Sequence, residues 1–197
     1  MQREYDNKMR NLAPAKPGID MAFFLLDVDF FKQVNDHYGH LAGDQLLIQL
    51  SALLTNVCRE SDCVVRWGGE EFLIVSRFSN RDEAPLMAER IRNHIAQADF
   101  VVSEGEVLKK TCSIGYACYP FLCEHPLALS WEQVIDTADR ALYAAKKSGR
   151  NRSVGLMASD KVSPDNLYLR ISQDVAALIA QGELVVIAQD AEILVWD

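Results

Sequence analysis

The chain has 197 residues, of which 49% are hydrophobic, so it is long enough for one domain with a sizeable core. Charged residues make up 24% of it, an ordinary share for a globular protein. The formal net charge of −8 argues against binding of long nucleic acid, because such binding usually needs a basic surface. Single nucleotides are not excluded, since a few local cations and a metal ion are enough to hold them.

Cysteine usage and apolar runs bear on the cellular location. There are five cysteines and no C-x-x-C pair, so reduced, mostly buried thiols are expected rather than a disulfide framework or a zinc site. This favours a cytoplasmic module. No stretch approaches the roughly 18 continuous apolar residues of a membrane span, and the polar residues 1–6 do not resemble a signal peptide.

The first part of the chain predicts a strand and two helices after a polar start. Residues 1–18 predict a short helix and then a loop, because the segment ends in prolines and a glycine. The nearly continuous apolar run over residues 21–27 is typical of a strand buried on both faces. A short helix is expected from about Phe30 to His37. A second helix is expected from near Gly43, where leucines recur at helical spacing.

The middle of the chain predicts a hairpin and another helix. Two short apolar runs, residues 63–67 and 72–75, flank a pair of glycines and indicate a β-hairpin with its turn at Gly68-Gly69. Residues 81–98 predict a helix with three apolar residues on one face: Leu86, Ile91 and Ile95.

Strands and a well-marked helix are expected next. Residues 100–119 hold β-rich runs interrupted at a glycine, which indicates one or two strands. Residues 131–147 predict a helix that ends near Gly149, a typical C-terminal cap. Its apolar stripe consists of Val134, Ala138, Ala141, Leu142 and Ala145. Residues 153–157 predict a further strand.

The last part of the chain, residues 158–197, differs in charge from the rest. It holds seven acidic and two basic residues, a net charge of −5, and no chemical motif. A helix over residues 167–180 and a strand over residues 183–188 are expected there. The order of the elements along the chain indicates a mixed α/β layout, not an alternating Rossmann pattern.

Three acidic residues are placed where their carboxylates could meet. Asp27 ends the first strand, and Glu70 and Glu71 follow the two-glycine turn. Two or three such oxygens, a backbone carbonyl and phosphate oxygens suit Mg²⁺, and the glycines leave room for a close-packed base or phosphate. Taken alone, however, such a turn is more often a solvated hairpin, and Asp27 is as well explained as a helix N-cap.

Four groups of residues stand out in this order along the chain: Asp27-Val28-Asp29-Phe30-Phe31-Lys32-x-x-Asn35-Asp36-x-x-Gly39-His40-x-x-Gly43-Asp44, Arg66-x-Gly68-Gly69-Glu70-Glu71-Phe72, Ser113-Ile114-Gly115, and Ala138-Asp139-x-Ala141-Leu142-Tyr143-x-Ala145-Lys146-x-x-Gly149-Arg150-Asn151. Together they resemble the signatures of the GGDEF domain of diguanylate cyclases, in the variant with Glu at the third position. The similarity covers about residues 20–157.

The resemblance implies a fold, an activity and a domain division. The implied fold is α+β, a mixed α/β sandwich with a central, mostly antiparallel sheet of about five strands flanked by helices, similar to palm and nucleotidyl-cyclase folds. The implied activity condenses two GTP molecules into cyclic di-GMP and pyrophosphate. Residues 1–157 would form the catalytic domain, and residues 158–197 an acidic extension of unassigned role.

The resemblance also implies which residues carry the chemistry. Asp27, Glu70 and Glu71 resemble the family's catalytic acids. The carboxylates of Asp27 and Glu70 and the carbonyl of Val28 would hold Mg²⁺, with Mn²⁺ as an alternative. Glu71 would help to bind the metal ion and to activate the ribose 3′-hydroxyl.

Residues that resemble GTP-binding residues lie on both sides of these acids. Asn35 and Asp44 resemble the guanine-binding pair, which fits because a carboxylate accepts hydrogen bonds from N1–H and the 2-amino group while an amide both donates and accepts. The others would contact phosphates or leave space for the nucleotide: Phe30, Phe31 and Lys32 through backbone N–H groups, Gly68 and Gly69 through the lack of a side chain, and Lys146 and Arg150, four apart on one helix face, through their charges. Alone, the last two would more often be favourable charges at a helix C-terminus.

A second site is implied just before the hairpin. Arg59 and Asp62 form an R-x-x-D pattern, with Asp62 six residues before Gly68. In the family, this pattern at this offset binds the product and inhibits the enzyme, and Arg90 resembles a secondary arginine of that site. Arginine suits a nucleotide because it binds phosphate bidentately and stacks on bases. The simpler interpretation is a surface ion pair.

Partners follow from the same resemblance. One domain of this family holds one GTP, so two domains must face each other antiparallel, and a homodimer is implied for catalysis. The family's usual D-x-L-T-G-L-x-N-R-R opening is absent, and Arg3-Glu4-Tyr5-Asp6 resembles only its tail. The N-terminal motif therefore looks truncated, and an upstream sensor or receiver domain is expected to be missing.

Two other functions compete with an active cyclase. A GGDEF domain can serve only as a cyclic di-GMP receptor, but receptors of this kind usually lose the signature acids, and Glu70 and Glu71 are intact. An unrelated nucleotidyl transferase on a palm-like sheet is the other alternative. The guanine-binding pair of Asn35 and Asp44 counts against it.

Overall fold

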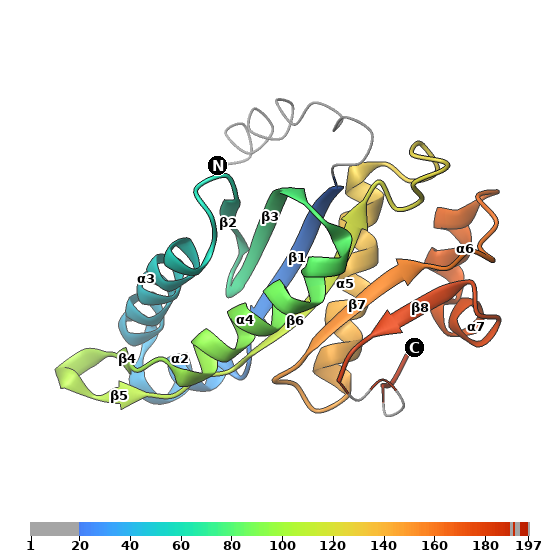
Figure 1. Ribbon diagram of the computed structural model, residues 1–197. Coiled ribbons are helices and arrows are strands. Elements are labelled where there is room, and N and C mark those ends of the chain that lie inside the picture. Colours follow the sequence, from blue (N-terminus) through green and yellow to red (C-terminus); the bar gives the residue numbers. More distant parts are fainter. Residues whose placement is uncertain (1–19, 190, 192–193, 197) are drawn as a thin grey trace.

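The computed structural model describes residues 20–189, 191 and 194–196 (Figure 1). The helix and loop expected over residues 1–18 therefore lie outside the described residues. In chain order the strands and helices are β1 (Asp20–Val28), α2 (Phe31–Tyr38), α3 (His40–Val57), β2 (Cys63–Gly68), β3 (Glu71–Ser79), α4 (Ala84–Gln97), β4 (Phe100–Val101), β5 (Val107–Leu108), β6 (Cys112–Tyr119), α5 (Trp131–Lys147), β7 (Ser153–Ala158), α6 (Leu167–Gln173), α7 (Val175–Ala180) and β8 (Leu184–Ile187). Short 3₁₀ turns occur at Arg81–Glu83 and Ser103–Gly105.

A six-stranded sheet with the order β2-β3-β1-β6-β7-β8 forms the centre of the described chain. β6 and β7 run parallel, and the other neighbouring strands run antiparallel. The expected mixed α/β fold with a mostly antiparallel sheet is confirmed. It has one strand more than expected, because β8 from the acidic extension pairs with β7. The short strands β4 and β5 form a separate ribbon beside α3 (Figure 1).

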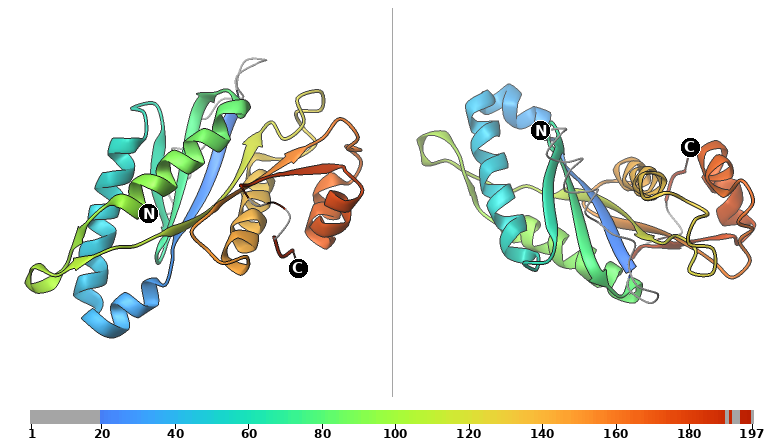
Figure 2. Two further views of the ribbon diagram at one scale, coloured as in Figure 1. Left: turned by 60° about the horizontal axis from the view of Figure 1, so that its bottom comes forward. Right: turned by 90° about the horizontal axis from the view of Figure 1, so that it is seen from above.

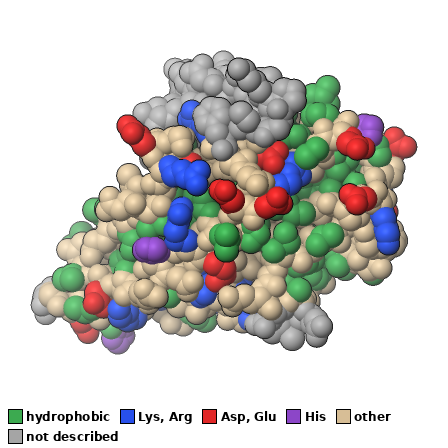
Figure 3. Space-filling model, viewed as in Figure 1, with side chains coloured by type: hydrophobic (Ala, Val, Ile, Leu, Met, Phe, Trp, Pro, Cys, Tyr) green, Lys and Arg blue, Asp and Glu red, His purple; other side chains and the backbone are tan. Residues whose placement is uncertain are grey.

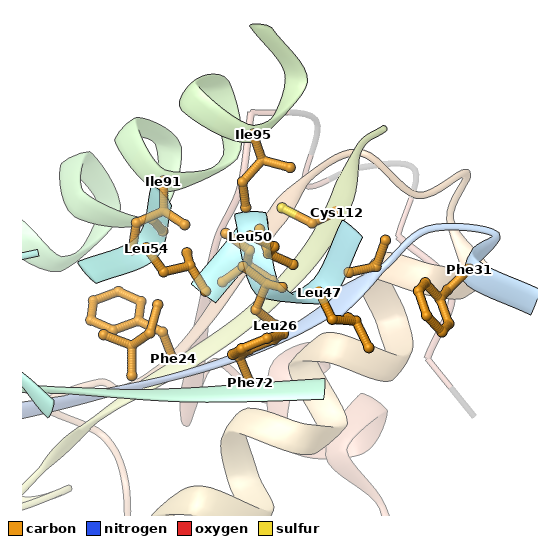
Figure 4. Packing of buried hydrophobic residues seen from close by; sticks show 14 of the residues in the cluster. Phe24, Leu26, Phe31, Leu47, Leu50, Leu54, Phe72, Ile91, Ile95 and Cys112 are labelled. Atoms are coloured by element: carbon orange, nitrogen blue, oxygen red, sulfur yellow. The ribbon is translucent and has the colours of Figure 1, made fainter. Parts of the chain in front are cut away.

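Strand β1 is the middle of the core and is buried on both faces, as its continuous apolar run predicts. Phe24 and Leu26 belong to a cluster shared with α2, α3 and α4 (Figure 4), whereas Phe23 and Leu25 belong to a cluster shared with α5, α6 and α7. All four side chains are 3% exposed or less. Figure 2 shows α4 and α5 on opposite faces of the sheet. Helices therefore cover both faces of β1.

Glycine and proline set the starts of two helices. α3 begins at His40, three residues before the expected Gly43, because Gly39 with φ 83° both ends α2 and precedes α3. α4 begins at Ala84 with Pro85 in its first turn. Its buried face is Ala84, Ala88, Ile91 and Ile95. The expectation for Leu86 was wrong: its side chain is 74% exposed.

The acidic extension is folded onto the rest of the molecule. The single helix expected over residues 167–180 is divided at Asp174, whose carboxylate accepts a hydrogen bond from Ala177 N and caps α7. Apolar residues of α6, α7 and β8 are buried in the same cluster as Phe23: Leu167, Ile171, Val175, Leu178 and Leu184. The extension therefore enlarges the core on the α5 side of the sheet.

Charges are mixed on the surface. Figure 3 shows basic and acidic side chains interspersed over one face, with no large patch of basic residues there. Within the described residues, no helix combines the length and the apolar character needed to cross a membrane.

Candidate active site

The end of β1 brings together segments that are distant in the sequence. Asp27 is paired with Glu71 at the start of β3 and with Ser113 at the start of β6. α2 begins directly after β1, and α5 ends beside the same edge, where Lys146 reaches Asp27. This edge of the sheet therefore collects residues from all four sequence motifs.

The turn between β2 and β3 consists of Gly69 and Glu70, one residue later than expected. The register skips one residue between Arg66 and Gly68, and Arg66 Nε donates a 2.8 Å hydrogen bond to the Gly69 carbonyl. Gly69 has φ 47°, which favours glycine. A Cβ added at Gly68 or Gly69 would meet no atom within 4 Å. Packing within the chain therefore does not require glycine at position 68, where the space stays open.

The three carboxylates meet a lysine at this edge. Lys146 Nζ lies 2.8 Å from Asp27 Oδ2 and 3.7 Å from Glu71 Oε1. Burial raises the pKa of Asp27, contact with Lys146 lowers it, and the charges of Glu70 and Glu71 raise it, with a net upward shift. Glu71 is paired with Asp27 across the sheet and Glu70 directly precedes Glu71, so the three predicted acids lie at the same end of β1.

The donor set at this edge fits an open magnesium site. Among the described residues, no three His, Cys, Asp or Glu side chains are already arranged around a metal position. Mg²⁺ usually takes only one or two protein carboxylates and completes its shell with water and phosphate oxygens. Asp27 and Glu70 supply such carboxylates, and the ammonium group of Lys146 already offsets the charge of Asp27.

The turn from β1 into α2 has an unusual backbone. Phe30 has φ 56° and ψ 34°, a left-handed conformation that costs a non-glycine residue about 1 kcal/mol. No side chain caps the start of α2 among the described residues. The N–H groups of Phe31 and Lys32 therefore lie at the positive end of the helix dipole without a cap from a described side chain.

One of the two expected guanine-binding residues, Asn35, packs against Gly43, the residue before the other, Asp44. A Cβ at Gly43 would lie 2.0 Å from Asn35 Oδ1, so only glycine leaves room for the Asn35 side chain. Asp44 follows Gly43 directly, and its side chain is exposed. Gly43 thus lets the Asn35 amide of α2 approach the α3 backbone one residue before Asp44.

Lys146 and Arg150 reach the same edge, but not as two residues on one helix face. α5 ends at Lys147, Gly149 has φ 108°, and Arg150 has φ 63°. The expected helical spacing was wrong because the left-handed Gly149 ends the helix. The Arg150 guanidinium instead stacks on the Phe30 ring, 4.7 Å from its centroid.

Asp29 belongs to the first of the four motifs, but it was not predicted to be a site residue. Its side chain is 1% exposed and accepts hydrogen bonds from Thr111 Oγ1 at 2.7 Å, Ser113 Oγ at 2.7 Å and Asn151 N at 3.0 Å. These donors lie 82 to 122 residues away in the chain. No local pattern signals such contacts. The only sequence signal was its position two residues after Asp27.

The R-x-x-D segment lies at the opposite end of the hairpin. Asp62 accepts hydrogen bonds from Arg59 N and Ser76 Oγ, both at 2.9 Å, and so closes its own turn. Arg59 Nη2 lies 3.5 Å from Glu83 Oε2, with both side chains more than half exposed. Arg59 and Arg90 border one groove of about 290 Å³. The structure therefore brings the two predicted arginines together.

Cys58 adds an electrostatic link in this region. Burial and the charge of Asp62 raise the pKa of the Cys58 thiol and Arg90 lowers it, with a net value of about 11. The charges of Asp62 and Arg90 therefore act on the same thiol. All three predicted residues of the second site lie around one place, the start of β2.

The fold and this edge define a class: an α+β domain with a cluster of acidic residues at the end of its central strand. The family model "Diguanylate cyclase, GGDEF domain" matches residues 1–152. The chain belongs to the GGDEF-domain family.

Two named relatives carry the family's activity in their names. Diguanylate cyclase A of Treponema denticola is 36% identical over 132 residues, 67% of this chain and 34% of that protein. Diguanylate cyclase DosC of Escherichia coli K12 is 38% identical over 144 residues, 73% of this chain and 30% of that protein. The chain thus spans about a third of the length of these relatives.

Solved structures of this fold are similar as well. The GGDEF domain of DgcB from Caulobacter crescentus, in complex with c-di-GMP, has a TM-score of 0.68 and 29% identity. The similarity covers 78% of this chain and 88% of that one.

Proposed function

We propose that this chain is the catalytic module of a diguanylate cyclase, which condenses two GTP molecules into cyclic di-GMP and pyrophosphate. The observation that supports it best is the meeting of Asp27, Glu70, Glu71 and Lys146 beside an open glycine turn. A purely structural hairpin does not need three half-buried carboxylates at one strand end, since their mutual repulsion disfavours folding.

Asp27, Glu70 and the Val28 carbonyl would hold Mg²⁺, with Mn²⁺ as an alternative. When bound, such an ion lowers the pKa of the attacking ribose hydroxyl and stabilises charge on the leaving group. Glu71 lies beside Asp27 in the sheet and is proposed to accept the 3′-hydroxyl proton. Lys146 would move from these carboxylates to the phosphates of the nucleotide.

The rest of the edge would bind and orient GTP. Asn35 and Asp44 are proposed to hydrogen-bond the guanine edge. The N–H groups of Phe31 and Lys32 at the start of α2 would hold phosphate oxygens, as helix N-termini commonly do. The turn at Phe30 and the guanidinium of Arg150 stacked on its ring would close the phosphate side. The space beside Gly68 and Gly69 would admit the nucleotide.

A homodimer is proposed for turnover. One such edge holds one GTP, and the 3′-oxygen of that nucleotide must reach the α-phosphorus of another. Two modules facing each other antiparallel would form the two bonds in turn. An upstream sensor or receiver domain would control how often they meet, and the module would work in the cytoplasm. Residues 1–157 would carry this chemistry, and residues 158–197 would support the sheet.

Product inhibition is proposed at the far end of the hairpin. Arg59 and Arg90 would bind the phosphates or bases of cyclic di-GMP in the groove that they border, and Asp62 would hold the Arg59 turn. The exposed Arg59–Glu83 contact is weak and easily exchanged for a ligand.

The direct test is product formation. The protein, held as a dimer by a fused coiled coil, is incubated with GTP and Mg²⁺, and cyclic di-GMP is measured by mass. Product from the native sequence and none from Glu70→Ala would support the cyclase. Absence of product with retained cyclic di-GMP binding would instead establish the alternative, a receptor module.

A further inference from the structure

Asp29 joins three separate segments at the proposed active site. Its Oδ2 accepts hydrogen bonds from Thr111 Oγ1 and Asn151 N, and its Oδ1 accepts one from Ser113 Oγ. Its own N–H donates to the Thr111 carbonyl at 3.0 Å. The carboxylate thus ties the end of β1 to the start of β6 and to the turn that follows α5.

These contacts separate Asp29 from the metal-binding acids. Asp29 stands two residues after Asp27, and carboxylates at this spacing invite assignment to the same metal ion. Both Asp29 oxygens, however, are already engaged by donors, and the side chain is 1% exposed. Asp27, in contrast, contacts Lys146 at the open edge. Asp29 must therefore act through the segments that it joins.

Both segments beside Asp29 have strained backbones. Phe30 follows it directly with φ 56°, and Arg150 and Asn151 have φ 63° and 45°. Left-handed conformations in non-glycine residues persist only where neighbouring groups hold them. Here the Asn151 N–H binds Asp29, and Lys110 Nζ donates to the Phe30 carbonyl at 3.4 Å. The buried Asp29 carboxylate therefore holds the Asn151 turn directly, and its own residue stands immediately before the Phe30 turn.

The two turns carry the proposed phosphate-binding groups. Phe30 sets the direction of the first N–H groups of α2, and Arg150 stacks on its ring. Asn35 and Asp44, the proposed guanine-binding residues, lie farther along α2 and α3, and among the described residues no hydrogen bond joins either of them to Asp29. A change at Asp29 should thus disturb phosphate binding and spare base binding.

We propose that Asp29 is a positioning residue, which fixes the α2 N-terminus and Arg150 relative to each other and so shapes the triphosphate subsite. This inference rests on the GTP site proposed above. It predicts that the loss of Asp29 weakens binding of a ligand with the triphosphate more than binding of a ligand with the base and ribose alone.

The test compares Asp29→Asn with the native protein and with Asp160→Asn, an exposed acid of the extension as the matched control. Binding of the slowly reacting α-thio analogue of GTP is measured by calorimetry, and binding of guanosine by competition. In Asp29→Asn the analogue should bind at least about tenfold more weakly, the loss expected for one buried hydrogen bond to a charged group. Guanosine affinity should stay within about twofold, and KM for GTP should rise more than kcat falls.

A second pair of variants guards against misfolding of Asp29→Asn. Thr111→Val removes the hydroxyl that donates to Asp29 and keeps the side-chain shape, whereas Thr111→Ser keeps the hydroxyl. Thr111→Val should weaken analogue binding by about fivefold, and Thr111→Ser should restore native affinity.

The outcomes distinguish the two proposals. Equal loss of analogue and guanosine affinity in Asp29→Asn, or unchanged analogue affinity in both Asp29→Asn and Thr111→Val, overturns the positioning role and leaves the cyclase proposal standing. Failure of the native protein to bind the analogue overturns the GTP site itself.

Discussion

The β2–β3 hairpin has carboxylates at one end and arginines at the other, and the two ends are held differently. At the turn, Lys146 contacts Asp27 at 2.8 Å, with side chains 27% and 14% exposed. At the other end, Arg59 contacts Glu83 at 3.5 Å, with side chains 59% and 58% exposed. A site for chemistry needs fixed groups, whereas a site for reversible inhibition must exchange its contacts readily. The same two strands connect both.

Glu70→Gln should break the carboxylate end with the largest effect. We expect kcat to fall about a thousandfold, because the variant removes a proposed metal ligand and its charge stabilisation. The melting temperature should not fall, since no described residue donates a hydrogen bond to Glu70 and its charge repels that of Asp27. Turnover is measured as the rate of cyclic di-GMP formation. The control variant is Glu124→Gln, because Glu124 is an exposed acid in a loop. Native turnover in Glu70→Gln would exclude it from the site.

Gly68→Ala tests whether the space at the turn is used by substrate. The added Cβ would meet no atom within 4 Å, so folding should be unaffected. Turnover should fall about a hundredfold if the methyl group displaces GTP by an ångström or so. Gly115→Ala is the opposite case, because its Cβ would lie 2.1 Å from the Ala138 carbonyl oxygen and should prevent normal packing. Melting curves and steady-state rates separate the two, and full activity of Gly68→Ala would refute the assignment.

Arg59→Ala should weaken product binding at the arginine end of the hairpin and leave catalysis at the carboxylate end unchanged. Affinity for cyclic di-GMP, measured by calorimetry, should fall about thirtyfold, since hydrogen bonds to charged phosphate groups are lost. The initial rate with GTP should stay native, and the rate late in the reaction should rise. Arg59→Lys keeps the charge but loses the bidentate contact, so its affinity should be intermediate. Unchanged binding in Arg59→Ala would leave the segment as a surface ion pair.

The smallest effect is expected at Glu89 on α4, which accepts hydrogen bonds from Arg92 and Ser153. Burial raises the pKa of Glu89, but hydrogen bonds from Arg92 and Ser153 outweigh it, and the net shift is downward from 4.5. The stability from these bonds is therefore fully present above pH 4.5 and is lost as pH falls through the lower folded-state pKa. Glu89→Gln should cost about 1 kcal/mol at pH 7, and the difference from the native protein should shrink in acid. Urea unfolding at several pH values measures this, and a difference that grows in acid would contradict the sign.

Features encoded by neighbouring residues could be predicted from the sequence, whereas features that depend on distant contacts could not. The apolar run of β1 and the stripe of α5 predicted those elements closely, because burial is encoded in neighbouring residues. The placement of Arg150 was missed because the left-handed Gly149 ends the helix before it. The role of Asp29 and the pairing of β8 depend on partners far along the chain, which periodicity does not reveal. The motif and the ends of the strands predicted that the carboxylates lie together. Their contact with Lys146 could be found only in the folded structure.

The pairing of β8 with β7 has a consequence for how the protein should be prepared. An unpaired strand edge is a template for association with another chain. In the described part of the chain, β8 covers the edge of β7 with antiparallel hydrogen bonds from Gly155 to Ala158. A protein cut after residue 157 would expose that edge and the apolar residues beneath α6 and α7. It would then self-associate through β7, at a distance from the carboxylates. A size measurement would show dimers, but these dimers could not make product. Oligomeric state and turnover should therefore be measured together on protein that keeps residues 158–197.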